Sequence, residues 1–152
     1  MVEPYERYAA AAVTWALARV GDPSYALRCL AFVEDAYERA NGIEVFGGDT
    51  ARESATRYGV TPYDVGAPPA AGSLVFYACG GPVEFVWREW GHVGVALGDG
   101  RVVHAWDHVR VDAAPDVELL TPADGWQRPS LIGWTSAERV LEGHRPRSWD
   151  VG

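Results

Sequence analysis

The chain has 152 residues, of which 48% are hydrophobic and 22% are charged, a balance typical of one globular domain with a sizeable core. Its formal net charge is −8. This charge excludes nucleic acid and anionic membrane surfaces as main partners, because both reward an excess of Lys and Arg. It also offers no attraction to an anionic cell wall.

Neither a leader nor a membrane anchor is predicted. No apolar run approaches the roughly 18 residues that a membrane-spanning helix needs. The first residues carry charges of both signs and lack the basic start of a signal peptide. We therefore expect a cytoplasmic protein, or one exported by a specialised or phage-like device that needs no signal peptide. Two cysteines do not make a disulfide framework.

Three helices are predicted in the first 60 residues, over 5–20, roughly 26–41 and 50–58. Apolar residues recur at i, i+3, i+4 and i+7 in the first two, and Asp49 or Thr50 caps the third. Glycines end them, at Gly21, Gly42 and Gly59. The predicted solvent side of the second helix carries its charged residues, Arg28, Glu34, Asp35, Glu38 and Arg39.

The start of the second helix decides how Cys29 behaves. A start at Asp22-Pro23 would place this residue too deep to gain from the helix dipole. A start near Arg28 would place it in the first turn, where the dipole favours a thiolate. We favour the later start, with 25–27 as an extended approach. The amide hydrogen of Cys29 could then donate to an oxyanion.

The second half of the chain has the character of a sheet. Strands are predicted at 73–78, 92–97, 101–106, 109–112 and 131–134. A loop rich in glycine and aromatic residues is predicted at 79–90, a Pro-broken stretch precedes the last strand, and a helical turn covers 135–141. Helices followed by strands indicate an α+β fold in which N-terminal helices pack on an antiparallel sheet, as a single domain over 1–152.

The turn at Gly98-Asp99-Gly100 decides whether two histidines can meet. A two-residue loop would send His92 and His104 to opposite faces of the sheet. A three-residue loop pairs His104 with Gly94 and places both histidines on one face, one diagonal apart. Gly100 can supply the left-handed residue that this loop needs. We predict the three-residue loop, with apolar residues on both faces and therefore a sheet covered on both sides.

Cys29, His92 and His104 are the parts of a cysteine nucleophile site. The thiolate is the nucleophile, His92 would take the thiol proton, and His104 would fix the tautomer of His92. The alternative is structural: Cys29 lies on the apolar face of its helix, where inert buried cysteines are common. Cys79, with no evident partner, is interpreted as an ordinary buried residue.

Two further arrangements stay open. A zinc site built from both cysteines and both strand histidines lacks the usual C-x-x-C or H-x₃₋₅-H spacing. His108 and His144 are interpreted as surface residues, although His108 lies close enough to the predicted cleft to compete with His104 as the orienting group.

Three segments resemble the NlpC-type papain-like cysteine peptidases, which cleave cell-wall peptides or related amides. Residues 25–29 (Tyr-Ala-Leu-Arg-Cys) resemble the approach to the family nucleophile. Residues 69–77 resemble its Pro-Gly-Asp-Leu-Val-Phe-Phe strand, and residues 91–105 resemble its two-histidine hairpin, including the twelve-residue step. The resemblance covers about residues 20–112. It implies Cys29 as nucleophile, His92 as base and His104 as third polar residue, on a helix packed against an antiparallel sheet.

The segment around the cysteine departs from that family. Arg28-Cys29-Leu30-Ala31 stands where the family usually has Asp-Cys-Ser-Gly, whose Asp and Ser bind a free amine in some members. Arg28 cannot bind an amine but suits a carboxylate, so we hypothesise a substrate carboxylate beside it. The resemblance also implies that Tyr25 stands for a family tyrosine near the oxyanion, at an offset position.

Aromatic residues surround the predicted site. Trp87 and Trp90 in the 85–90 segment, together with Trp106, are candidates to grip a peptide or a sugar, and rim packing is the alternative. The predicted function is therefore a bacterial cysteine amidase or endopeptidase that acts on a peptidoglycan-type peptide through an acyl-enzyme, without metal or cofactor. Acyl or peptidyl transfer and a catalytically silent peptide-binding module are the alternatives. An immunity protein or a carrier protein is a candidate partner.

Overall fold

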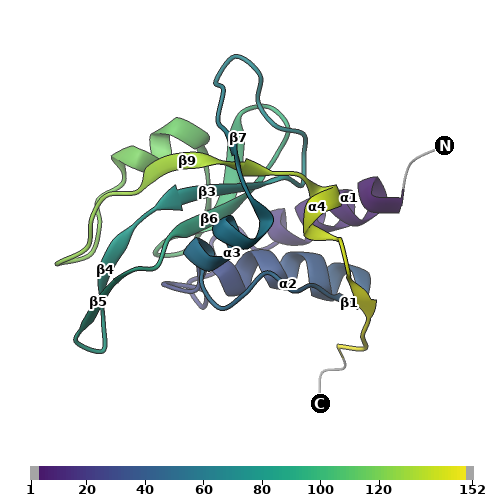
Figure 1. Ribbon diagram of the computed structural model, residues 1–152, viewed down its shortest axis with the longest axis horizontal. Helices are drawn as coiled ribbons and strands as arrows, with labels where there is room; N and C mark the ends of the chain where they lie inside the picture. Colours follow the sequence, from purple (N-terminus) through teal and green to yellow (C-terminus); the bar gives the residue numbers. More distant parts are fainter. Residues whose placement is uncertain (1–3, 150–152) are drawn as a thin grey trace.

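Six antiparallel strands form the main sheet in the order β2-β9-β3-β6-β7-β8 (Figure 1). The computed structural model describes residues 4–149. The strands of this sheet are β2 (Thr61–Pro62), β3 (Leu74–Ala78), β6 (His92–Ala96), β7 (Arg101–Ala105), β8 (Val109–Ala113) and β9 (Ser130–Thr135). A separate two-stranded sheet pairs β1 (Ile43–Glu44) with β10 (Arg145–Pro146), so that the C-terminal segment lies beside the end of the second helix.

Helices and the sheet enclose two apolar layers. The larger layer lies between the sheet and the helices α1 (Pro4–Leu17), α2 (Cys29–Asn41), α3 (Ala51–Tyr58) and α4 (Ala137–Val140). The smaller lies on the opposite face, under the 3₁₀ helix η1 (Ala114–Leu119). Both faces of the sheet are therefore covered, and the predicted α+β arrangement is confirmed. No helix within residues 4–149 is long and apolar enough to cross a bilayer.

Helix α2 begins at Cys29, which confirms the later of the two predicted starts. The residues before it form turns, with the Ala26 amide donating to Pro23, so the expected extended approach is wrong. The solvent-side prediction for Glu38 is also wrong. Glu38 is buried and its carboxylate accepts from the Val45 amide at 3.0 Å, because the chain turns at Gly42 and folds back along the helix.

A β-hairpin replaces the loop predicted at 79–90. Its strands β4 (Gly80–Val83) and β5 (Val86–Glu89) pair directly and leave Glu84 and Phe85 as a two-residue turn. Both turn residues have positive φ, 50° and 68°. The hairpin projects from one end of the main sheet (Figure 1), and the Phe85 side chain is fully exposed at its tip.

The register of β6 and β7 follows the three-residue loop. His104 pairs with Gly94, and the Leu97 amide donates to the Arg101 carbonyl at 2.9 Å. His92 and His104 therefore share one face of the sheet, as predicted. The second of these strands ends at Ala105, one residue before its predicted end.

Candidate functional site

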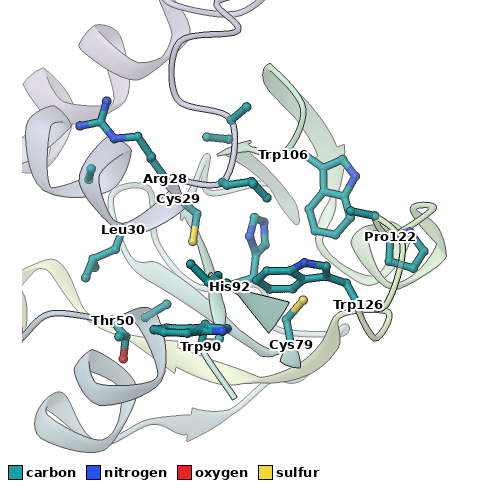
Figure 2. A pocket seen from close by; sticks show the side chains of 18 of the residues that line it. Arg28, Cys29, Leu30, Thr50, Cys79, Trp90, His92, Trp106, Pro122 and Trp126 are labelled. Atoms are coloured by element: carbon teal, nitrogen blue, oxygen red, sulfur yellow. The ribbon is translucent and has the colours of Figure 1, made fainter. Parts of the chain in front are cut away.

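A cavity of about 800 Å³ opens at the N-terminal end of α2. Its walls come from residues 26–31, 48–51, 90–92, 105–107 and 121–123, together with Glu34, Cys79, Val83 and Trp126. Cys29 and His92 both line this cavity (Figure 2). The helix, the loop before α3, the start of β6 and the Pro-broken stretch after η1 thus converge on the predicted nucleophile and base.

Cys29 is the first residue of α2, directly after the N-cap residue Arg28. The first amides of a helix have no partner within the helix, and they favour negative charge nearby. Two residues earlier, Leu27 has a φ of 61°, which is unfavourable for a residue with a Cβ. Backbone strain of this kind is often held at functional sites. The local backbone therefore presents Cys29 at the point where the dipole and the free amides act together.

The thiol of Cys29 is not a preformed thiolate. Burial raises its pKa to about 11, while the backbone amides of Val93 and Leu30, and its own, act in the opposite direction. Burial likewise raises the pKa of Cys79 to about 11. The resting cysteine at neutral pH is thus protonated and needs a base to become a nucleophile.

His92 is that candidate base. Figure 2 shows its ring and the Cys29 sulfur directed into the same space. The ring is buried and packs against Tyr77, His104 and Trp106, with centroids 5.7, 5.0 and 5.3 Å away. Burial, reinforced by His104, holds the pKa of His92 well below its usual value, so this imidazole is neutral at pH 7.

Gly91 brings the loop before α3 against this histidine. Its φ is 78°, and a Cβ there would lie 2.6 Å from the Arg52 amide nitrogen. The same amide donates to the Trp90 carbonyl at 2.9 Å. Only glycine fits this close approach, which places the 48–51 wall of the cavity beside His92.

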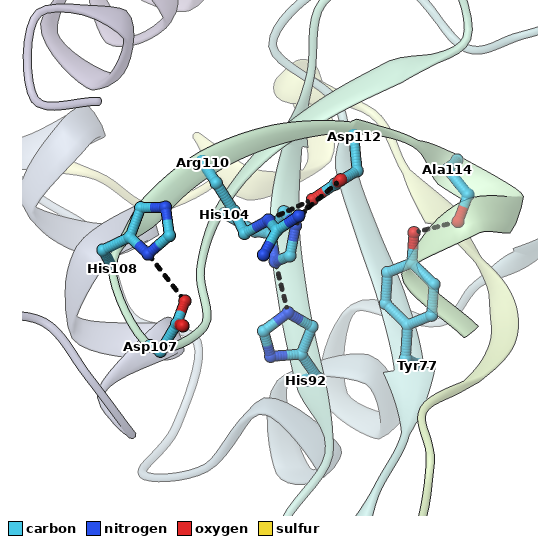
Figure 3. Close-up of polar contacts among 8 residues, drawn as sticks. All are labelled: Tyr77, His92, His104, Asp107, His108, Arg110, Asp112 and Ala114. Carbon is cyan, nitrogen blue, oxygen red and sulfur yellow. Dashed lines mark hydrogen bonds and ion pairs between the residues drawn. The ribbon is translucent and has the colours of Figure 1, made fainter. Parts of the chain in front are cut away.

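His104 lies behind His92 and is fully buried. Its Nδ1 is 2.8 Å from His92 Nε2, and its Nε2 is 2.8 Å from an oxygen of Asp112. Figure 3 marks both contacts. Arg110 donates to the same carboxylate from Nε at 2.8 Å and from a terminal nitrogen at 3.2 Å. Asp112 and Arg110 were not among the residues predicted from sequence.

The aromatic and charged candidates divide into two groups. Arg28, Trp90 and Trp106 line the cavity. The Arg28 side chain makes no ion pair within residues 4–149, and in Figure 2 its guanidinium points away from the Cys29 sulfur. Tyr25 and Trp87 lie outside the wall. The first donates to Asp35 at 2.6 Å and packs in the helical layer.

Trp126, from the Pro-broken stretch, is an aromatic wall residue that no sequence pattern predicted. Its ring lies so close to Gly81 that a Cβ there would be 2.0 Å from it. Trp90 donates from its indole nitrogen to the Gly81 carbonyl at 2.8 Å. The absence of a side chain at Gly81 therefore lets the Trp126 indole pack against the hairpin, while the Gly81 carbonyl holds the Trp90 indole at the cavity.

Glu34 also lines the cavity, although the sequence predicted that it would face solvent. It is half-buried, and no hydrogen bond or ion pair to its carboxylate is found among the described residues. Burial, together with the nearby carboxylates of Glu38, Asp35 and Asp49, raises its pKa to about 8. The cavity thus carries an ionisable group that is protonated for a large fraction of the time near neutral pH.

The remaining histidines are engaged elsewhere. His108 forms a 2.7 Å contact with Asp107, and His144 Nδ1 lies 2.7 Å from the Leu141 carbonyl oxygen. It is His104, not His108, that contacts His92. Within residues 4–149, no three His, Cys, Asp or Glu side chains are grouped as metal ligands, and Cys79 instead donates to the Gln127 carbonyl at 3.5 Å.

Comparisons with known proteins find similarity to a solved structure. No protein-family model matches the chain, and no curated protein matches it. The solved structure of RipD from Mycobacterium tuberculosis, described as a non-catalytic NlpC/p60 domain protein adapted to peptidoglycan binding, is similar with a TM-score of 0.50 at 16% identity. The similarity covers 82% of this chain and 95% of that one. The chain therefore has an NlpC/p60-like fold.

Proposed function

We propose that this protein is a cysteine hydrolase that cleaves an amide bond through an acyl-enzyme on Cys29. The observation that carries the proposal is the arrangement of two residues around one cavity. Cys29 begins a helix there, and the neutral imidazole of His92 faces the same space while its other nitrogen is held by His104. A thiol, a base and a group that orients the base are the parts that this chemistry needs.

The reaction would begin with the thiol protonated. His92 takes the proton as the sulfur attacks the amide carbonyl carbon, and the Cys29 amide at the helix N-terminus donates to the developing oxyanion. Collapse of the intermediate breaks the C–N bond, and His92 returns the proton to the leaving amine. Water, activated by the same imidazole, then hydrolyses the thioester. An amine in place of water would make the protein an acyl or peptidyl transferase.

A peptidoglycan-type peptide is the proposed substrate class. RipD, which shares the fold, is described as peptidoglycan-binding. The cavity also offers features that suit a peptide fragment: indole walls from Trp90, Trp106 and Trp126, and a cationic residue, Arg28, in its lining. The immunity or carrier protein stays a prediction.

A catalytically silent peptidoglycan-binding module is the second candidate. One observation favours it: burial holds the Cys29 thiol at a pKa of about 11, where a spontaneous thiolate is rare at neutral pH. RipD is itself described as non-catalytic. The two candidates differ only in whether His92 activates the sulfur.

Cys79 is an internal control for that question. Both thiols are free, line the same cavity and have a pKa of about 11. Because Cys29 is partly exposed whereas Cys79 is buried, faster alkylation of Cys29 by iodoacetamide, followed by mass spectrometry, reports a neighbouring base only where it depends on His92. We expect Cys29 to react at least about tenfold faster than Cys79, and His92→Gln to abolish the difference. Equal, slow reaction of both would favour the binding module.

The bond itself can be found by mass spectrometry of peptidoglycan fragments incubated with the wild type and with Cys29→Ala. New termini that form only with the wild type identify a hydrolase, and new amide-linked products identify a transferase. Fragments that bind to both proteins without any product would contradict the proposed activity.

A further inference from the structure

The hydrogen bonds that link His92 to His104 and His104 to Asp112 end at the Asp112 carboxylate. This carboxylate determines which atom donates in each of them. Asp112 receives both Arg110 contacts and the contact from His104 Nε2 (Figure 3). Burial alone would raise the pKa of Asp112, but the hydrogen bonds from His104 and Arg110 outweigh it and hold the pKa below its usual value. Asp112 is therefore ionised at pH 7 and can only accept hydrogen bonds.

The protons on both imidazoles follow from this carboxylate. His104 Nε2, which is 2.8 Å from a carboxylate oxygen, must carry a hydrogen. Burial lowers the pKa of His104 despite the Asp112 hydrogen bond, so the ring is neutral and its Nδ1 has only a lone pair. His92 Nε2, 2.8 Å from that lone pair, must then be the donor. The remaining nitrogen of His92, Nδ1, is left bare.

We infer that Asp112 is a positioning residue: held by Arg110, it sets the tautomers of His104 and His92 and so leaves His92 Nδ1 free to accept a proton. The role of that nitrogen toward Cys29 rests on the proposed function, whereas the tautomers themselves do not. In the proposed reaction the thiol proton moves to Nδ1, and the electron pair of the broken S–H bond forms the new S–C bond.

Without the Asp112 carboxylate, nothing fixes which nitrogen of His104 carries the proton. His104 could then carry its proton on Nδ1 and donate to His92 Nε2. A neutral His92 would in that case carry its own proton on Nδ1, where it could no longer accept one from the thiol. Asp112→Ala creates this condition, whereas Asp112→Asn keeps one oxygen that can still accept from His104.

The tautomers can be measured directly by long-range ¹H–¹⁵N correlation spectra of the full chain with ¹⁵N-labelled histidine at pH 7.5. The chain has four histidines, and His108→Gln and His144→Gln assign the two that lie outside the network. We expect His92 and His104 both to be Nε2–H tautomers in the wild type and in Asp112→Asn. In Asp112→Ala both should shift toward Nδ1–H. A wild-type His92 with its proton on Nδ1 overturns the inference, as does an unchanged Asp112→Ala spectrum.

Asp99→Ala is the matched control. Asp99 lies in the neighbouring turn and pairs with Arg101, but it is exposed and does not touch either histidine of the network. Its removal should leave the spectra of His92 and His104 unchanged. If Asp112→Ala does not fold, the wild-type and Asp112→Asn spectra still decide the tautomers.

The alkylation rate of Cys29 separates this inference from the proposed function. Asp112→Ala should slow Cys29 at least about tenfold and leave Cys79 unaffected, with Asp112→Asn in between. Tautomers that change as expected without any change in Cys29 alkylation would support the inference and contradict the proposed activity.

Discussion

Gly94 in β6 and His104 in β7 are cross-strand partners, and a Cβ added to Gly94 would lie 2.9 Å from the His104 Cβ. Real Cβ atoms essentially never approach so closely. The space that a side chain at position 94 would need is therefore taken by the Cβ of His104. Gly94, in the sequence Gly-His-Val-Gly around His92, thus makes room for the histidine of the neighbouring strand.

Gly94→Ala should push His104 away from its contact with His92. We expect a loss of about 1–3 kcal/mol in the free energy of unfolding, measured by urea denaturation, because the sheet is packed on both faces. Cys29 alkylation should slow in the same variant. Gly66→Ala, in an exposed loop where a Cβ would find its nearest neighbour at 3.4 Å, is the control and should change neither quantity.

Glu34→Gln should make stability less dependent on pH. The folded pKa of about 8 lies above the ordinary value of 4.5, so the folded state holds a proton that the unfolded chain has already released. The wild type therefore loses stability as the pH rises from about 4.5 to 8, and the loss stops above that range. Urea denaturation at pH 5, 7 and 8.5 should show that the free energy of unfolding of the variant rises relative to that of the wild type as the pH increases.

Glu138→Gln supplies the comparison for this measurement, because Glu138 is an exposed glutamate of α4. The stability difference from the wild type is followed across the same pH values in both variants. The same pH dependence in Glu34→Gln and Glu138→Gln would mean that the Glu34 carboxylate ionises normally in the folded protein.

Leu27→Gly should stabilise the chain. Leu27 holds a φ of 61° and is 75% exposed, so glycine relieves strain while giving up little burial. The expected gain is roughly 0.5–1 kcal/mol in thermal or urea unfolding. Ala26→Gly, one residue earlier and also exposed but without a positive φ, should be neutral or destabilising. A destabilised Leu27→Gly would mean that Leu27 makes contacts worth more than its strain.

The tip of the β4–β5 hairpin should be improved by Asn-Gly. Glu84 and Phe85 both adopt positive φ in a two-residue turn, for which Asn and Gly are the favoured residues. Glu84→Asn with Phe85→Gly should slow hydrogen exchange of the hairpin amides, with a local gain of about 1 kcal/mol. Equal exchange rates in the variant and the wild type would show that the turn is not strained.

Arg28→Ala should remove a preference for a carboxylate near the nucleophile. Two matched peptide fragments, one ending in a free acid and one in an amide, would be compared for binding to the Cys29→Ala protein. Because Arg28 is exposed, we expect the acid to be favoured only about two- to fivefold. The preference should vanish with Arg28→Ala and survive Arg28→Lys. The same preference in all three proteins would remove the carboxylate hypothesis.

The core of the site could be predicted from sequence because it rests on short-range rules. Loop length and the position of glycine determine the register of a hairpin, so the pairing of His104 with Gly94 follows from the turn at 98–100. The start of α2 at Cys29 was one of two predicted possibilities. Hydrophobic periodicity alone could not choose between them, because it does not locate a helix start to the residue.

Asp112 was missed although a signal for it existed. The turn between β7 and β8 pairs Ala105 with Val109, and this register places Arg110 opposite His104 and Asp112 opposite Val102. Both side chains therefore share the face of His104. The same loop-length argument, extended by one hairpin, would have found them.

No comparable pattern in the sequence predicts the hairpin at 80–89 or the position of Trp126 in the cavity wall. Gly80-Gly81-Pro82 has the composition of a loop, and its strand is stabilised by pairing with β5 and by an indole that packs against each glycine. The backbone that carries Trp126 is irregular, so no periodicity marks which residues turn toward the cavity.

The walls of the cavity are drawn from positions between 26 and 126, so no single segment of the chain can form it. Only the folded chain can therefore bind an occupant, so binding raises the free energy of unfolding and with it the melting temperature. A compound present at a hundred times its dissociation constant would add about 2.7 kcal/mol to the folded state. Melting temperatures measured with a library of peptidoglycan fragments could thus identify the natural ligand without any assumption about bond cleavage.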